Sequence, residues 1–211
     1  MNAAAALLSL FLPAASFAAP PTKAPVRAGT TAPQKKPADP KDGERLAAQA
    51  DALRAQGRDK DAIAVYIRAL EVYDEVLAPD DLRLAEALDG LSRSLASQGL
   101  YEDAEKMGLK SARIIATVKG PRVLEVAYAA ERLARISALD RKLAQSIAYY
   151  EQALSIEGET WGPDSPRLSG LLEEYLGILR RTPRKADIAR IEGRLASLKS
   201  RESQKDSRPR K

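Results

Sequence analysis

Residues 57–70, GRDKDAIAVYIRAL, follow the same sequence pattern as residues 99–112, GLYEDAEKMGLKSA. In both stretches a glycine is followed five residues later by an alanine. Three dipeptides in which alanine or glycine precedes proline occur at positions 78–79, 120–121 and 162–163. Each follows the one before it at the same interval as that between the two glycines. A fixed period in the range of roughly 20 to 50 residues, here about 42, is the sequence signature of a solenoid, in which each unit stacks on the next.

Apolar residues within a unit recur at the spacing of an α-helix. Leu84, Leu88, Leu91 and Leu95 follow one another at steps of four, three and four, which puts them on one helix face. Each unit is therefore predicted to be a helical hairpin, and the fold class to be all-α. The small residues of the repeat are expected in the core, where they let paired helices approach closely: Ala50, Ala62, Ala69, Ala134 and Ala153.

The turn inside each hairpin has its own signal in two of the units. Gly57 and Gly99 are expected to end a first helix, because glycine readily takes the positive φ that closes a last helical turn. The third unit has Asp140-Arg141 at this place, so its turn is less well defined by the sequence. The prolines at 79, 121 and 163 are expected to mark the joints between units.

These positions resemble the tetratricopeptide repeat, in the long form of the repeat found in kinesin light chains and their bacterial relatives. The resemblance is carried by Gly57-x-x-x-x-Ala62, by Ala62-x-x-x-Tyr66-x-x-Ala69-Leu70 and by the joint Gly162-Pro163-Asp164. HEAT repeats have a similar period but lack this pattern. The resemblance implies a right-handed α-solenoid of about four antiparallel hairpins over residues 44–198, with units at about 44–78, 84–120, 125–162 and 166–198.

The fourth unit departs from the pattern. Its second-helix motif fits only when one inserted residue brings Ala189, Gly193 and Ala196 into register. An end unit can also leave core surface uncovered, and here that surface would be apolar: Ile188, Ile191, Leu195 and Leu198. Such a face would allow the array to join end to end with a second copy.

Composition excludes much of catalysis. The 211 residues include no cysteine and no histidine, which removes disulfides, thiol nucleophiles, imidazole bases and the commonest zinc ligands. Carboxylates are plentiful, but none of them converges on a recognisable catalytic pattern. We therefore expect neither an enzyme nor a cofactor.

The N-terminus differs from the array. Residues 1–18 form an uncharged run around Leu7, Leu8 and Leu10, with small residues near its end, and are predicted to be a cleaved secretory signal peptide. An uncleaved membrane anchor, a cytosolic leader and a misassigned start remain as alternatives. Residues 19–43 are rich in Pro, Ala and Lys and are predicted to be a disordered linker, and residues 199–211 a basic disordered tail. The predicted location is secreted or periplasmic.

The positive charge is concentrated outside the predicted array. Of the net charge of +5, the linker carries +3 and the tail +4, so the array between them carries −2. Nucleic-acid binding usually needs a basic stripe on the folded domain, and we therefore expect no nucleic-acid partner. The tails could instead touch an anionic lipid or cell-wall polymer, or could simply aid solubility.

Repeats of this family line a concave groove with the first helix of each unit, and two charged rows fall on these helices. Asp89, Glu131 and Glu173 are each one repeat period apart, as are Arg93 and Arg135. One interpretation is that Asp89 pairs with Arg93, and Glu131 with Arg135, as ordinary i,i+4 ion pairs. The other is that the rows meet a peptide or helix of a partner protein, together with three further residues: Arg54, Tyr128 and Arg180.

A terminal-carboxylate clamp of the co-chaperone type is not expected. The corresponding places hold Ala47, Asp51, Gly90 and Tyr128, and only Arg132 agrees. Taken together, the sequence predicts an exported, non-catalytic scaffold that binds a protein partner. The alternative is a solenoid that associates with itself as a structural element of an envelope assembly.

Overall fold

The computed structural model describes residues 39–206, and the side chains within them up to Arg201. This part of the chain consists of helices joined by short turns and contains no strand. The predictions for residues 1–38 and 207–211 lie outside the described residues. The elements follow one another as α1 (Pro40–Ala55), α2 (Asp59–Val76), α3 (Leu82–Ser97), α4 (Tyr101–Lys119), α5 (Leu124–Leu139), α6 (Leu143–Trp161), η3 (Pro166–Leu168), α7 (Ser169–Leu179) and α8 (Lys185–Asp206).

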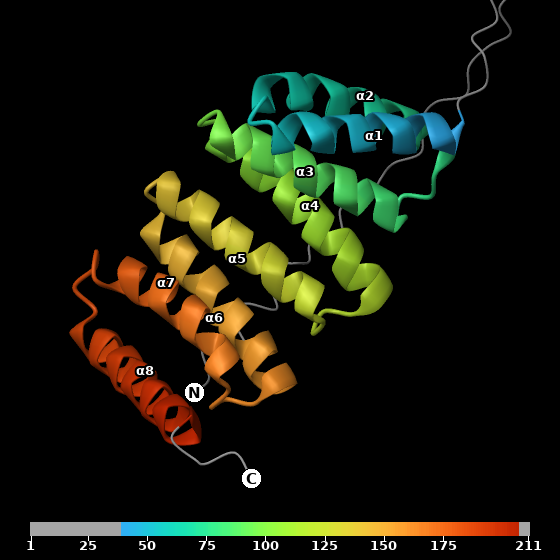
Figure 1. The fold of residues 1–211 in the computed structure, drawn as a ribbon. Coiled ribbons are helices and arrows are strands. Elements are labelled where there is room, and N and C mark those ends of the chain that lie inside the picture. Colours follow the sequence, from blue (N-terminus) through green and yellow to red (C-terminus); the bar gives the residue numbers. More distant parts are fainter. Residues whose placement is uncertain (1–38, 207–211) are drawn as a thin grey trace, which may run out of the picture.

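The helices pair into four antiparallel hairpins that stack in chain order, from α1 and α2 at one end to α7 and α8 at the other (Figure 1). The all-α solenoid predicted from the sequence is confirmed. Each first helix packs on the second helix of its own unit, and α3 and α5 also pack on the second helix of the unit before. The buried apolar residues form two clusters, one mainly in the first two hairpins and one in the last two, and both include residues of α5.

The hairpin turns of the first three units share one geometry. Gly57, Gly99 and Arg141 have φ values of 73°, 77° and 60°. The amide of the next residue then donates to the carbonyl five positions earlier, for example Arg58 N to Leu53 O at 2.9 Å and Lys142 N to Ser137 O at 2.8 Å. This closes the helix end as in a Schellman motif. The third unit thus forms the same turn without glycine, and Arg141 is the residue held in the left-handed region.

The joints between hairpins are less uniform. Gly120 and Gly162 take φ values of 101° and 90°, which L-residues rarely adopt. Ala78 occupies the equivalent place in the first joint and has no positive φ. In keeping with this, α2 ends at Val76, one residue earlier relative to the repeat than α4 and α6.

The predicted small positions lie in the core. Ala50, Ala62, Ala69, Ala134 and Ala153 have no exposed surface, and the tyrosines of the second helices fill the space between them. Two glycines pack directly against tyrosine rings: Gly90 of α3 lies against Tyr66 of α2, and Gly43 of α1 against Tyr73 of α2. Close packing of this kind leaves little room for an added methyl group.

Both ends of the solenoid differ from the predicted boundaries. α1 begins at Pro40 instead of residue 44, because the Asp39 side chain accepts from Lys41 N and proline fits the first helical position. α8 continues to Asp206, through part of the predicted disordered tail. Residues 199–206 contain no glycine or proline, and most of their residue types are compatible with helix.

The register predicted for the fourth unit is wrong. Ala189, Gly193 and Ala196 are exposed, whereas Ile191, Leu195 and Leu198 of the same helix are buried. The larger aliphatic side chains occupy the inner face because they bury more apolar surface against α7. The terminal face proposed for self-association is therefore turned into the core, and α8 closes the array with a largely polar surface.

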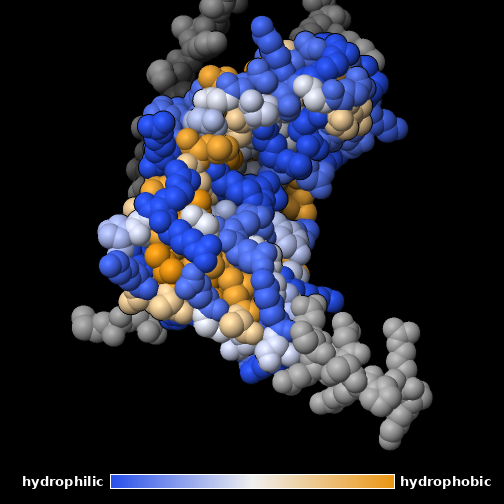
Figure 2. Space-filling model, turned by 60° about the vertical axis from the view of Figure 1, so that its left-hand side comes forward, coloured by the Kyte–Doolittle hydropathy of each residue, from blue (hydrophilic) through white to orange (hydrophobic). Residues whose placement is uncertain are grey.

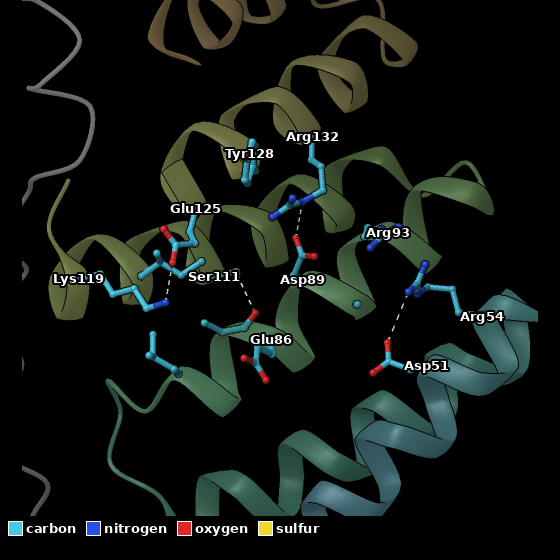
Figure 3. Close-up of a pocket in the computed structure, with 14 residues that line it drawn as sticks. Asp51, Arg54, Glu86, Asp89, Arg93, Ser111, Lys119, Glu125, Tyr128 and Arg132 are labelled. Atoms are coloured by element: carbon cyan, nitrogen blue, oxygen red, sulfur yellow. Dashed lines mark hydrogen bonds and ion pairs between the residues drawn. The ribbon is translucent and has the colours of Figure 1, made fainter. Parts of the chain in front are cut away.

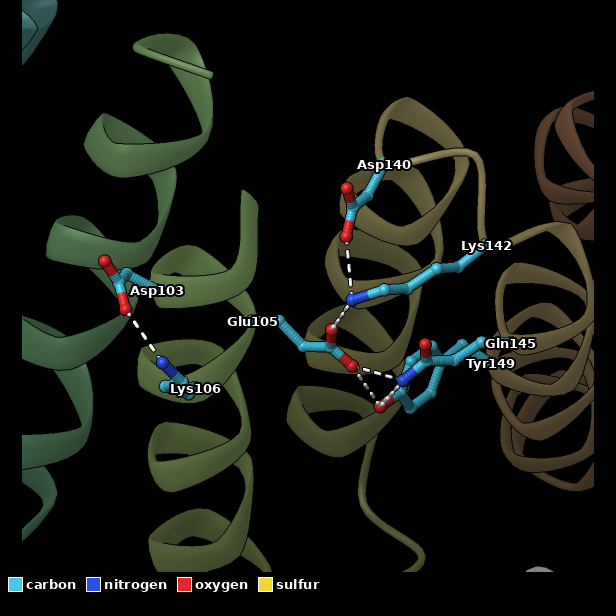
Figure 4. A network of polar contacts seen from close by, with 7 residues as sticks. All are labelled: Asp103, Glu105, Lys106, Asp140, Lys142, Gln145 and Tyr149. Carbon is cyan, nitrogen blue, oxygen red and sulfur yellow. Dashed lines mark hydrogen bonds and ion pairs between the residues drawn. The ribbon is translucent and has the colours of Figure 1, made fainter. Parts of the chain in front are cut away.

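Ion pairs tie neighbouring units together on both sides of the array. On the second helices, Glu105 of α4 meets Lys142 beside α6 at 3.3 Å, and Lys142 also contacts Asp140 at 2.7 Å (Figure 4). Arg83 of α3 reaches Glu44 of α1 at 2.9 Å. Hydrophilic residues cover most of the face seen in Figure 2, and apolar residues lie between them in small groups.

Candidate partner-binding groove

A hollow of about 390 Å³ opens between the first helices of the first three units. Figure 3 shows charged side chains from α1, α3 and α5 around it, and α4 contributes further lining residues. Its lining residues are Asp51, Arg54, Leu82, Ala85, Glu86, Asp89, Gly90, Arg93, Ser111, Ile115, Lys119, Glu125, Tyr128 and Arg132. Four of the predicted groove residues are thus brought together: Arg54, Asp89, Arg93 and Tyr128.

A second hollow of about 370 Å³ is lined by Arg93, Ala96, Arg132 and Arg135. It shares Arg93 and Arg132 with the first hollow, so the two lie side by side, and together they are called the groove below. The charge along the groove is uneven. The second hollow is lined by three guanidinium groups and no carboxylate, while carboxylates lie in the first.

The predicted pair between Asp89 and Arg93 does not form. Asp89 instead meets Arg132 of the following unit, with Oδ1 2.6 Å from Nε. Both side chains are about three-quarters buried, which favours this pair over one with the more exposed Arg93. Within residues 39–201, Arg93 has no hydrogen bond or ion pair to another side chain. Its charge is available to a ligand.

Asp51 and Arg54 form the wall of the groove on α1. The Tyr66 hydroxyl donates to Asp51 Oδ1 at 2.6 Å, and Arg54 Nη2 lies 3.6 Å from the same oxygen. Burial raises the pKa of Tyr66 to about 12, and the hydrogen bond to Asp51 acts in the same direction. Tyr66 therefore remains a neutral donor at physiological pH and holds Asp51 in place.

Arg135 joins α5 to α7 at the other end of the groove. The predicted pair with Glu131 is confirmed at 2.9 Å, and Arg135 also binds Glu174 of α7 through Nε and Nη2 at 2.7 and 3.0 Å. The Arg135 guanidinium lowers the pKa of Glu174. The Tyr150 hydroxyl donates to Glu174 as well, at 3.1 Å. Charge-assisted hydrogen bonds therefore connect α5 to α7 at this end of the groove.

Glu131 also faces a second carboxyl group, Glu157 of α6. Glu157 is only 3% exposed. Burial raises its pKa to about 8, and a hydrogen bond with Glu131 adds to the effect. Two carboxylates in contact cannot both ionise without a large cost, so one proton is held between them near neutral pH. The protonated Glu157 acts as a donor beneath the groove-lining helix α5.

The two remaining predicted groove residues lie apart from the groove. Glu173 of α7 pairs with Lys199 of α8 at 2.9 Å, and Arg180 pairs with Glu192 of α8 at 2.6 Å. Neither residue lines either hollow. The acidic row predicted from the repeat period therefore divides: Asp89 lines the groove, Glu131 joins the network beneath it, and Glu173 supports the last hairpin.

The sequence patterns missed several residues that shape the groove. Arg132 and Glu174 are themselves one repeat period apart and form a row beside the predicted ones, which periodicity could have found. Glu157 stands at the repeat position of Tyr73 and Ile115, where the pattern expects an apolar side chain. A single carboxyl group at a position that is otherwise apolar predicts a buried polar contact.

The described residues contain no helix long and apolar enough to span a bilayer. In the same part of the chain, no group of three carboxylates could hold a metal ion. Arg132, the one position that agreed with a carboxylate clamp, is engaged with Asp89. The expectation that this chain has no such clamp stays a prediction.

The fold and the groove define an α-solenoid repeat protein with a charged groove across three units. Residues 45–117 match the family model described as tetratricopeptide repeat, which covers nearly all of α1 to α4. The tetratricopeptide repeats predicted from the sequence are thereby confirmed over residues 45–117. A search of curated proteins finds no match.

Solved structures of repeat proteins share the fold at low sequence identity. BtubC (BKLC) from P. vanneervenii is 17% identical and superposes with a TM-score of 0.71, covering 84% of this chain and 71% of that one. A putative kinesin light chain with nearly identical TPR-like repeats from Podosopora anserina is 12% identical, with a TM-score of 0.53 over 81% and 99% of the two chains. The MamA RS-1 ArsTM double mutant is 18% identical, with a TM-score of 0.56 over 79% of each chain. The tetratricopeptide fold supports a role as a protein-interaction scaffold.

Proposed function

We propose that this chain is a non-catalytic scaffold that binds a segment of a partner protein in the groove. The observation that carries the proposal is the hollow of about 390 Å³ formed by three consecutive units. It is lined by Arg93, which has no side-chain partner among residues 39–201, and by Tyr128, which is 40% exposed. An exposed aromatic ring beside an unpaired arginine is typical of the anchor residues of protein interfaces.

The groove has a direction that a bound segment would follow. Arginines gather in the second hollow, whereas Glu86 and Asp89 lie in the first. A partner segment with a carboxylate near Arg93 and an apolar side chain against Tyr128 matches this arrangement. Opposite charges set the orientation and the rate of association more than the final affinity.

Two further features support a binding role over catalysis in this proposal. The sequence has no histidine and no cysteine, the residues most used as general bases and nucleophiles. The carboxyl group with the raised pKa, Glu157, is buried beneath α5 and does not line either hollow. It therefore cannot reach a ligand in the groove.

The proposal places the protein in the bacterial envelope, with residues 1–18 acting as a cleaved signal peptide. The uncharged apolar run of those residues supports this location. Self-association through the last hairpin finds no support, because Ile191, Leu195 and Leu198 are buried. Fusion of a reporter active only outside the cytoplasm tests the location, and activity of a cytoplasmic reporter alone would argue against it.

The groove is tested by reversing the charge of Arg93. Arg93→Glu is expected to weaken capture of the native partner at least tenfold, because a carboxylate of the partner then meets a like charge beside Asp89. Arg113→Glu on α4 makes the same change at an exposed site outside the hollows and should leave capture unchanged. Affinity purification from the native host, followed by quantitative mass spectrometry, measures both. Equal capture by the two variants would refute the groove as the binding site.

A further inference from the structure

The last unit carries a charge opposite to that of the rest of the array. Residues 163–201 contain nine arginines and lysines against five carboxylates, a net charge of +4. Residues 39–162 contain 17 against 22, a net charge of −5. Lys199 and Arg201 fall in the segment that was predicted to be a disordered tail, but both lie on the ordered helix α8. The basic region is thus a surface of the folded array.

Several of these cations have no carboxylate beside them. Lys185 has no hydrogen bond or ion pair from its side chain among residues 39–201. Arg181 and Arg194 donate to backbone carbonyls, at 3.5 Å to Ala138 O and 2.7 Å to Pro163 O, which leaves their charges uncompensated. Arg190 pairs with Asp187 at 3.0 Å, but an exposed pair of this kind is weak and readily exchanged.

The outer face of α8 is built from small residues between these cations. Ala189, Gly193 and Ala196 are exposed, while the large aliphatic residues of α8 face α7. Helix α8 is the last element of the array, and within residues 39–206 no further helix follows it (Figure 1). None of the large exposed hydrophobic residues of the described chain falls between 163 and 201.

We propose that the last unit, centred on Arg181, Lys185 and Arg190, binds the surface of an anionic phospholipid bilayer. The contact is electrostatic and peripheral, because the apolar side of α8 is buried and cannot insert. It is separate from the groove, which lies on the first three units, so a partner and a membrane can be bound together. Basic clusters attract anionic headgroups over about a Debye length, and the attraction falls steeply with salt.

A bilayer fits this surface better than a nucleic acid. Proteins that bind single strands stack bases on exposed aromatic rings. Here Tyr175 is buried, and Trp161 is half-buried under the Arg167 guanidinium, which lies 5.5 Å from its ring centroid. The last unit also contributes no residue to either of the two hollows.

Vesicle co-sedimentation of the full chain tests the proposal. The chain should bind vesicles of phosphatidylcholine with about a third phosphatidylglycerol at low salt, and should lose binding when salt is raised to roughly 0.5 M. The triple variant Arg181→Gln, Lys185→Gln, Arg190→Gln is expected to lower the partition coefficient on the order of a hundredfold, since each cation contributes about fivefold near the surface.

A matched triple variant removes three cations elsewhere: Arg68→Gln, Lys110→Gln and Arg113→Gln on α2 and α4. It should bind the vesicles as the unaltered chain does, and both variants should keep the same thermal midpoint by circular dichroism. Equal losses in the two variants would overturn the proposal, as would equal binding of the unaltered chain to pure phosphatidylcholine. Tighter binding to a DNA oligonucleotide than to the anionic vesicles would also overturn it. Failure of this test leaves the groove proposal unaffected, because the groove shares no residue with this surface.

Discussion

Replacing Glu157 by glutamine is expected to abolish most of the fall in stability that the unaltered chain shows as pH rises from about 5 to 8. Burial raises the pKa of Glu157 to about 8, whereas an unfolded glutamate titrates near 4.3. Between these values the folded chain holds a proton that the unfolded chain has released. The free energy of unfolding therefore decreases by roughly 1.4 kcal/mol per pH unit, to a total on the order of 3–5 kcal/mol.

Glutamine keeps a donor for Glu131 but cannot ionise. Glu157→Gln should match the unaltered chain near pH 5 and exceed its free energy of unfolding by a few kcal/mol at pH 8. Urea denaturation at several pH values, followed by circular dichroism, measures the difference. Glu159→Gln serves as the control, because Glu159 is exposed and pairs with Arg122. A variant at position 157 with the same pH dependence as the unaltered chain would show that no proton is held there.

Adding one methyl group at Gly90 is expected to lower the free energy of unfolding by about 2 kcal/mol, a typical cost of overpacking a tight helix contact. A Cβ at this position would lie 2.6 Å from Cε1 of Tyr66, well inside van der Waals contact. The ring cannot move away freely because it is buried and its hydroxyl binds Asp51. The better helix propensity of alanine recovers only part of the loss.

The same substitution should have the opposite sign at Gly158, a helical glycine of α6. No atom lies within 4 Å of a Cβ built there, so Gly158→Ala should raise stability by about 0.5–1 kcal/mol through helix propensity alone. Thermal and urea unfolding of both variants compares them directly. If Gly90→Ala is as stable as Gly158→Ala, then α2 and α3 are not packed as closely as the account requires.

The fold was predictable from the sequence because each repeat has positions where sterics allow only a few residue types. Ala62 and Ala104 can only be small where two helices touch, and Gly57 and Gly99 mark turns that need a positive φ. The third hairpin turn could not be predicted in this way, because it has no glycine. Arg141 takes the same conformation because the surrounding hydrogen bonds impose it, and residue type alone does not reveal that.

The groove was predictable in part. The assignment of the groove to the first helix of each unit correctly places Arg54, Asp89 and Tyr128 in one hollow, because the first helices of three consecutive units line it. The period could not reveal that Asp89 pairs with Arg132, since that choice depends on partial burial across a helix interface. It also failed for Glu173 and Arg180, because the last unit changes register and α8 supplies their partners.

The most direct test of the account is a photo-crosslink from inside the groove. A benzophenone amino acid replaces either Tyr128, which lines the groove and is 40% exposed, or Ile67 of α2, which lies outside the groove and is 45% exposed. Irradiation in the native host should join position 128, and not position 67, to one dominant protein, and the attachment should fall within one short segment of that protein. Equal crosslinking from both positions, or none from position 128, would contradict the claim that the groove holds a partner.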